Sequence, residues 1–243
     1  MSAMLAAEGL TKNFGAVTAA AAITLSFDAD TVVSLIGANG AGKTTFLNMV
    51  TGYLKPDSGR ILFGGRNIVG LDPRQVTKLG ISRSFQIPQL FSSLSVRDNL
   101  LIAESVAAAS DPRSAANAAL ARFGLEPYAS RLAGSLSEGI RKLLDVAMAL
   151  SSRSKLLLLD EPTSGVSADE KFGIMDVVMG AARDAGVRVI FVEHDMDIVA
   201  RFAGRVVAFY EGGIIGDGPP QTVLRMKDVR RYVIGEEAPH AQA

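Results

Sequence analysis

The chain has 243 residues, of which 48% are hydrophobic and 21% charged, and its 25 basic residues balance 25 acidic ones. This apolar share excludes an intrinsically disordered chain, and the length suits one large domain or two small ones. A net charge of zero argues against general polyanion binding, so no nucleic-acid partner is expected, and the absence of cysteine excludes disulfides and thiolate metal sites.

The N-terminal part of the chain alternates short apolar runs with turn residues, which favours strands joined by tight turns. Strands are expected over residues 5–27 (two, antiparallel), 31–36, 60–63 and 81–85. Helices are expected over 45–50 and from Asp72–Pro73 to Gly80, where Asp is a good N-cap and Pro a good first helical residue.

Alanine-rich stretches replace the β-branched runs between about Ser92 and Ser152, and prolines break them into helices. Alternating strands and helices then return. Strands are expected over 156–159, 187–192 and 205–210, and helices over 168–185 and 196–202, the first of them capped by the Ser167-x-x-Glu170 box.

The pattern as a whole predicts an α/β protein with a mostly parallel sheet, an N-terminal antiparallel β subdomain and an inserted helical subdomain. The expected core comprises residues 1–91 and 153–235. The helical subdomain is expected over 92–152, and residues 236–243 are expected to form a flexible tail.

One glycine-rich segment matches a phosphate-binding motif. Residues 37–45 read Gly-Ala-Asn-Gly-Ala-Gly-Lys-Thr-Thr, which fits the P-loop pattern Gly-x4-Gly-Lys-[Ser/Thr] between a strand and a helix. Glycines let backbone N–H groups converge on a polyphosphate, and the helix adds its positive end. Lys43 is expected on the β/γ-phosphates and the Thr44 hydroxyl on Mg²⁺. The predicted nucleotide-binding residues are Gly37, Asn39, Gly40, Ala41, Gly42, Lys43, Thr44 and Thr45.

Two carboxylates end the apolar run 156–159. Asp160 is expected at the carboxyl end of a core strand, where it can hold the Mg²⁺ hydration shell. Glu161 points elsewhere and is expected to activate the water that attacks the γ-phosphate. The alternative for both residues is the opening of a polar loop.

With these motifs in order, the chain resembles the nucleotide-binding subunit of an ATP-binding cassette (ABC) transporter, with a P-loop NTPase core. The resemblance covers residues 5 to about 232, and it implies four further site segments. Phe14 matches the aromatic residue that stacks on adenine, and Gln86 matches the glutamine that reaches Mg²⁺ and the attacking water. Ser137 and Gly139 lie in the signature segment, and His194 matches the histidine that contacts the γ-phosphate.

Other interpretations of these residues stay open. Phe14 could be a hydrophobic turn residue packed on the strands, Gln86 an ordinary polar residue at a strand end, and His194 a capping or core histidine. The signature reads Leu-Ser-Glu-Gly-Ile in place of Leu-Ser-Gly-Gly-Gln. Because this segment completes the partner's site in the family, Glu138 and Ile140 put the partner's hydrolysis in doubt.

The resemblance is narrower at residues 83–91 and 160–167, which are similar to ATPases of branched-chain amino-acid, amide and urea uptake systems. It implies an ATPase with ATP and Mg²⁺ as cofactors that powers an importer. The expected partners are a second ATP-binding subunit, transmembrane permease subunits and, indirectly, a solute-binding protein. An apolar lip at Ile87, Pro88, Leu90 and Phe91 suits a permease helix, although these residues could instead pack inside the helical insertion.

The N-terminus lacks a signal peptide and no apolar run reaches the roughly 18 residues of a membrane span, so a soluble chain is expected. The resemblance implies a location at the cytoplasmic face of the inner (plasma) membrane, with peripheral attachment through the permease subunits. Three other functions account for parts of the pattern. The first is a nucleotide-gated subunit with weak hydrolysis, acting as the degenerate half of a heterodimer. A soluble ABC ATPase of DNA repair or translation would need coiled-coil insertions or a second cassette, and a simple P-loop kinase leaves His194 unexplained.

Overall fold

A computed structural model describes residues 3–28, 32–151 and 154–235 and divides the chain into two compact units. The first unit comprises Met1–Pro73 and Val192–Ala243, and the second comprises Arg74–Phe191. The predicted helical segment 92–152 therefore lies within the second unit. The predicted tail 236–243 lies outside the described residues.

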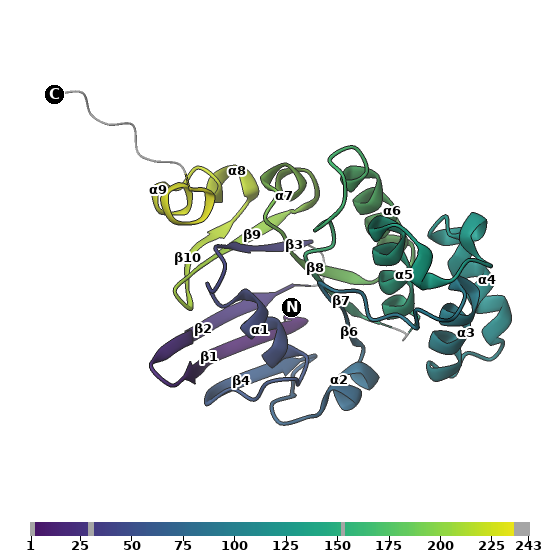
Figure 1. The fold of residues 1–243 in the computed structure, drawn as a ribbon. Helices are drawn as coiled ribbons and strands as arrows, with labels where there is room; N and C mark the ends of the chain where they lie inside the picture. Colours follow the sequence, from purple (N-terminus) through teal and green to yellow (C-terminus); the bar gives the residue numbers. More distant parts are fainter. Residues whose placement is uncertain (1–2, 29–31, 152–153, 236–243) are drawn as a thin grey trace. The chain divides into compact units, whose positions relative to one another are not determined.

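The first unit holds two groups of strands (Figure 1). One is an antiparallel sheet in the order β2-β1-β4-β5, and the other has the order β10-β9-β3, with β3 parallel to β9. The strands are β1 (Leu5–Phe14), β2 (Val17–Phe27), β3 (Val33–Gly37), β4 (Ser58–Phe63), β5 (Arg66–Asn67), β9 (Arg205–Tyr210) and β10 (Gly213–Gly218). The helices are α1 (Lys43–Val50), α7 (Met196–Phe202), α8 (Pro220–Val223), α9 (Lys227–Val229) and the π-helical turn η3 (Arg230–Ile234).

Three phenylalanines fix α1 within the first unit. Phe46 on α1 is fully buried, and its ring centroid lies 6.0 Å from that of Phe27 on β2 and 5.9 Å from that of Phe209 on β9. A fully buried aromatic side chain contributes a large apolar area to the core. This packing between the two groups of strands holds the start of α1 where β3 ends.

The second unit is built on the strand order β8-β7-β6, in which β6 and β7 are parallel. Its strands are β6 (Ile81–Ser84), β7 (Leu156–Asp160) and β8 (Arg188–Val192), whose last residue belongs to the first unit. Its helices are α2 (Pro73–Leu79), α3 (Val96–Val106), α4 (Pro112–Arg122), α5 (Glu138–Leu150) and α6 (Lys171–Asp184), with the 3₁₀ turns η1 (Glu126–Tyr128) and η2 (Ala133–Ser135). Every residue of β7 is buried, as its run of four leucines predicts.

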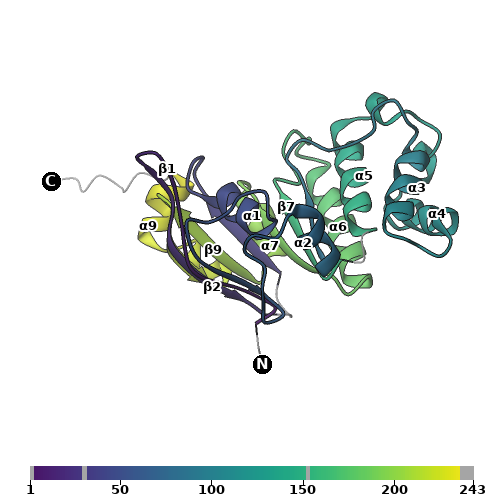
Figure 2. The ribbon, with the colours of Figure 1, turned by 90° about the horizontal axis from the view of Figure 1, so that it is seen from below.

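The helical part of the second unit is built from α3, α4 and α5, which lie side by side in Figures 1 and 2. Asp111 caps α4 by accepting hydrogen bonds from the N–H groups of Arg113 and Ser114, and Pro112 is the first residue of the helix, in keeping with the expected division of this region by prolines. The predicted α/β class, the antiparallel N-terminal sheet and the inserted helices are all confirmed. Among the described residues, no helix is long and apolar enough to cross a bilayer.

One predicted helix begins later than expected, and the elements after residue 210 were missed. The helix expected from residue 168 begins at Lys171, because the Ser167 hydroxyl bonds to the Glu170 carboxylate at 2.8 Å within a turn that precedes the helix. The C-terminal elements β10, α8 and α9 were not predicted. Strand β10 contains three glycines in six residues, so it lacks the apolar alternation that marks a strand.

Candidate active site

The glycine-rich loop joins β3 to α1 in the first unit. All five residues of β3 are buried, and α1 begins at Lys43. Gly42 has a φ of +107°, and a Cβ built on it would lie 2.5 Å from the carbonyl oxygen of Ala19. Both the backbone conformation and the lack of space therefore exclude a side chain here. Glycine is therefore required at residue 42, at the start of α1, where the backbone N–H groups of a P-loop would approach a phosphate closely.

The Lys43 ammonium lies over this loop. Its Nζ donates to the carbonyl oxygens of Gly37 at 2.6 Å and Ala38 at 3.0 Å, and the side chain is buried. No side chain caps the start of α1 within the part of the chain that the structure describes. A cation beside the N–H groups of a helix start suits an anion. The loop therefore fits the polyphosphate of ATP, whose oxygens could replace the two carbonyls.

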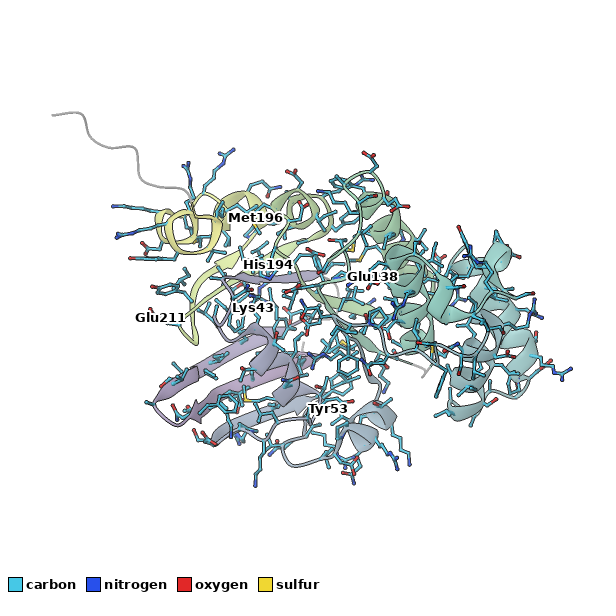
Figure 3. The ribbon with its side chains drawn as sticks, viewed as in Figure 1. Lys43, Tyr53, Glu138, His194, Met196 and Glu211 are labelled. Carbon is cyan, nitrogen blue, oxygen red and sulfur yellow. The ribbon has the colours of Figure 1, made fainter. Side chains whose placement is uncertain are left out.

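The other predicted nucleotide-binding residues lie in the same loop and in the first turn of α1. Asn39, Gly40 and Thr44 are exposed, Thr45 is half-buried and Ala41 is buried. The exposed Thr44 hydroxyl is an oxygen ligand of the kind that Mg²⁺ prefers. In Figure 3, Lys43 marks the start of α1 and His194 the segment before α7, both in the first unit.

Phe14 ends β1 at the tip of the β1–β2 hairpin, and 51% of its surface is exposed. The nearby Lys12 ammonium lies 5.7 Å from its ring centroid. A turn residue packed on the strands would be buried, so the exposure argues against that alternative. An exposed aromatic face is what stacking on a base requires.

His194 lies between β8 and α7 and is exposed. Its backbone N–H donates to the Glu193 carboxylate at 3.1 Å, and the N-cap of α7 is Asp195, which accepts from the N–H groups of Asp197 and Ile198. His194 is therefore neither a core residue nor the cap of α7. The prediction that it contacts a γ-phosphate stays a prediction.

Asp160 is the last residue of β7, and it forms a buried ion pair that the sequence did not indicate. Its Oδ2 lies 2.6 Å from Nη2 of Arg83 on β6, and both side chains are only 5–6% exposed. Because β6 and β7 are parallel and adjacent, the two residues meet near the same end of the strands. The carboxylate predicted to hold the Mg²⁺ shell thus has a guanidinium partner in this structure.

Glu161 follows Asp160 and contacts Gln86 through its side chain. Gln86 Nε2 donates to Glu161 Oε2 at 2.8 Å, so the structure brings these two predicted catalytic residues together. Glu161 has a φ of +52°, a conformation that is uncommon for residues other than glycine. Such strain is concentrated at functional sites. The contact with Glu161 argues against Gln86 as an ordinary polar residue at a strand end.

Two buried charged residues of α5 face this region, and the sequence analysis missed both. Lys142 Nζ donates to the carbonyl oxygens of Glu161 and Gln86, and the Asp145 carboxylate accepts from backbone N–H groups of residues 85 and 89. Burial raises the pKa of Asp145, against the hydrogen bonds that lower it. The available signal was the pair of charges inside the otherwise apolar face of α5, at residues 142 and 145.

The signature segment leads into α5. Ser137 is the N-cap residue of α5 and is exposed, and its side chain makes no capping hydrogen bond. Glu138 directs its carboxylate to Arg141, 3.7 Å away. Gly139 is buried, and a Cβ on it would lie 2.7 Å from Ile174 of α6. A side chain at residue 139 would therefore require the flexible end of Ile174 to move.

The predicted apolar lip is divided in this structure. Ile87 is 71% and Phe91 49% exposed, whereas Pro88 is buried and Leu90 is half-buried. Interior packing therefore accounts for Pro88 and leaves Ile87 and Phe91 at the surface.

A family model described as ABC transporter matches residues 20–164, which is more than half of the chain. The chain belongs to the ABC transporter family. It is 31% identical over 250 residues to the high-affinity branched-chain amino acid transport ATP-binding protein BraF of Pseudomonas aeruginosa, covering 96% of this chain and 98% of that protein.

Solved ABC cassettes share the fold over nearly the whole length. The ADP conformation of MJ1267, an ATP-binding cassette of an ABC transporter, matches with a TM-score of 0.86 and 30% identity, covering 97% of this chain and 100% of that one. The cassette cbiO1 of Clostridium perfringens, part of the cbiONQ complex, matches with a TM-score of 0.82 and 32% identity, covering 95% and 94%. The P-loop and the Gln86–Glu161 pair therefore lie in an ABC cassette, a nucleotide-binding ATPase.

Oxygen ligands of the kind that magnesium prefers occur in each unit. Thr44 offers a hydroxyl in the first unit, and Gln86 and Asp160 offer an amide oxygen and a carboxylate in the second. In the described residues, no group of three or more His, Cys, Asp or Glu side chains forms a separate metal site. This composition suits Mg²⁺ bound together with nucleotide phosphates rather than a metal enclosed by protein ligands alone.

Proposed function

We propose that this chain is the ATP-hydrolysing subunit that powers an importer of branched-chain amino acids or related small polar solutes. The observation that carries the proposal is the side-chain contact between Gln86 and Glu161 at 2.8 Å, in a chain that matches branched-chain amino acid transport ATP-binding proteins over almost its full length. The contact joins the two side chains that the hydrolytic step needs.

In this proposal the loop of residues 37–45 binds the triphosphate of ATP. Its backbone N–H groups and the start of α1 hold phosphate oxygens, and Lys43 exchanges its carbonyl partners for the β- and γ-phosphates. Phe14 stacks on the adenine ring, which the exposure of its face permits. His194 donates a hydrogen bond to the γ-phosphate.

Thr44, Asp160 and Gln86 are the residues that would hold Mg²⁺, which neutralises charge that develops on the phosphates. Glu161 accepts a proton from the attacking water, and Gln86 holds the Glu161 carboxylate in place through its amide. The exposed Ser137 and the backbone at Gly139 complete the nucleotide site of a second cassette, so that two cassettes close on ATP and reopen after hydrolysis.

The proposed partners are a second ATP-binding subunit, transmembrane permease subunits and, indirectly, a solute-binding protein, with no nucleic acid. The exposed Ile87 and Phe91 lie beside Gln86 in the chain and are apolar contacts available to a permease. The chain then works at the cytoplasmic face of the plasma membrane, attached through the permease.

The test of the hydrolytic role is Glu161→Gln in the full chain, together with any subunits that co-purify with it. Loss of the general base should lower ATP turnover by about 10²–10⁴-fold while ATP binding is retained. Glu126→Gln removes an exposed glutamate of the same unit and is the matched control. Turnover of Glu161→Gln at the rate of the control would refute the role of Glu161.

The transport role needs a separate experiment. Co-purification with membrane subunits, followed by ATPase measurement with and without candidate solutes, should show hydrolysis that rises with a branched-chain amino acid or a related solute. ATPase activity that no permease or solute changes would contradict the proposed coupling.

A second candidate is favoured by the signature. Glu138 and Ile140 replace the glycine and glutamine common in the family, so the chain could be a nucleotide-gated subunit with weak hydrolysis that pairs with an unlike cassette. Rapid turnover by a homodimer of the purified chain excludes this candidate, whereas turnover only in the presence of a second, different cassette supports it.

A further inference from the structure

Helix α5 carries two charged residues on its buried face, and neither has a place in the mechanism above. Lys142 is 3% exposed and Asp145 is 5% exposed. They lie three residues apart and so share one face of the helix. Lysine is almost never buried without partners, because its ammonium group loses hydration. The partners of these two side chains therefore indicate what they do.

Lys142 joins the two predicted catalytic residues through their backbones. Its Nζ donates to the carbonyl oxygen of Glu161 at 2.7 Å and to that of Gln86 at 3.2 Å. The side chains of the same two residues meet at 2.8 Å. Gln86, Glu161 and Lys142 thus form a closed ring of contacts, in which one ammonium bonds to both backbones and the two other side chains bond to each other.

The backbone of Glu161 needs such a contact. Its φ of +52° is unfavourable for a residue with a side chain, and such conformations persist only where the surroundings determine them. A charge-assisted hydrogen bond to the carbonyl of the strained residue is a direct means of holding it. The Lys142 ammonium thus restrains the residue that carries the Glu161 carboxylate.

Asp145 fixes the loop on both sides of Gln86. Its Oδ2 accepts from the N–H of Phe85 at 3.2 Å and its Oδ1 from the N–H of Gln89 at 2.9 Å. The hydroxyl of Ser84 is a further donor. Gln86 itself is exposed between these anchors, so its backbone is held while its side chain remains accessible.

We propose that Lys142 is a positioning residue for ATP hydrolysis: it holds Glu161 and Gln86 in the arrangement that activates water, and Asp145 secures the loop that carries Gln86. This inference rests on the proposed role of Glu161 as the general base. Since α5 begins at the signature serine Ser137, the same helix carries the signature and the support of the hydrolytic pair.

The test is a comparison of Lys142→Met, which keeps the length and removes the ammonium, with Lys142→Arg, which keeps donors for two carbonyls. A misplaced general base lowers kcat and leaves ground-state binding intact, so kcat of Lys142→Met should fall about 10–100-fold with KM for ATP within about 3-fold of wild type. Lys142→Arg should recover to within about 5-fold of wild type. Lys78→Met, at an exposed lysine of the same unit, should leave both constants unchanged.

A second arm places Lys142→Met in a Glu161→Gln background. If Lys142 acts through Glu161, its effect on the residual rate should shrink to less than about 3-fold there, because coupled residues are not additive. An equal loss in both backgrounds overturns the proposal, as does unchanged kcat or a rise in KM alone. If Lys142→Met does not fold, Lys142→Gln, which keeps one donor, is measured in the same two backgrounds with the same criteria.

The two proposals fail in different ways. If Glu161→Gln turns over ATP at the wild-type rate, Glu161 is not the general base and the proposed hydrolytic mechanism is refuted. A slow Glu161→Gln combined with a fast Lys142→Met leaves that mechanism in place and removes only the positioning role.

Discussion

The ion pair between Arg83 and Asp160 gives the sharpest prediction about stability. The perturbation is Arg83→Met, which keeps much of the side-chain volume and removes the guanidinium. The two side chains are 2.6 Å apart and only 5–6% exposed, so Asp160 would be left as a buried carboxylate without its cationic partner. Burying an uncompensated charge is one of the costliest single changes in a protein.

The magnitude follows from burial. Removal of one partner of a buried pair costs about 3–5 kcal/mol, and a chain of this size loses about 2–4 °C in Tm per kcal/mol, so Tm should fall by about 6–20 °C. The chain offers a matched control. Arg60 and Glu8 lie 2.7 Å apart, but their side chains are 66% and 40% exposed. Arg60→Met should therefore cost at most about 1 kcal/mol, or about 4 °C.

The assay is thermal unfolding of both variants without nucleotide, at the same pH and salt. Adding Asp160→Asn to Arg83→Met should recover part of the loss, because the carboxylate that had lost its partner is then gone. The inference is contradicted if the Tm of Arg83→Met falls no more than that of Arg60→Met. It is also contradicted if adding Asp160→Asn lowers the Tm of Arg83→Met further, by as much as Asp160→Asn lowers the Tm of wild type.

Three further predictions concern the loop, a helix and pH. Gly42→Ala should abolish measurable ATP binding, because its Cβ would lie 2.5 Å from a backbone oxygen; ATP affinity near wild type would contradict the proposed cradle. Gly180→Ala lies inside α6 with open space around it and should stabilise the chain by about 0.5–1 kcal/mol in denaturant unfolding; a loss would show hidden crowding. The hydrogen bond from Lys12 holds the pKa of Asp57 below its ordinary 3.8, so this pair stabilises the fold above that pH and the contribution is lost as pH falls through the lowered pKa. The Tm of Asp57→Asn should thus lie below wild type at about pH 6 and converge with it at about pH 2, and a constant gap would contradict the shift.

Local patterns in the sequence predict most of the fold and the contiguous parts of the candidate site. The P-loop is contiguous, so the order of glycines, Lys43 and Thr44 is enough to predict a cradle between a buried strand and a helix. The strand of four leucines likewise predicts where Asp160 and Glu161 lie along the chain, because a fully apolar run of that length indicates a buried strand. Such motifs depend on neighbours a few residues away.

The remaining contacts join residues far apart in the chain, and the sequence holds no local sign of them. Lys142 contacts Gln86 across 56 positions and Glu161 across 19. Arg83 meets Asp160 across 77 positions. These pairs depend on β6 lying beside β7 and on α5 packing near β6, which is a result of tertiary structure. The error at Ser167 has a different cause, because the local bond between Ser167 and Glu170 forms in a turn as well as at a helix start.

The central claim is that the loop of residues 37–45 binds the phosphates of ATP and that Lys43 is its cation. The most direct measurement is a crystal structure of the Glu161→Gln variant, in complex with any subunits that co-purify, soaked with ATP and Mg²⁺. The account predicts phosphate oxygens on the loop amides, with Lys43 Nζ moved from the Gly37 and Ala38 carbonyls to the β- and γ-phosphates. Nucleotide bound elsewhere, or Lys43 still on those carbonyls with nucleotide present, would contradict it.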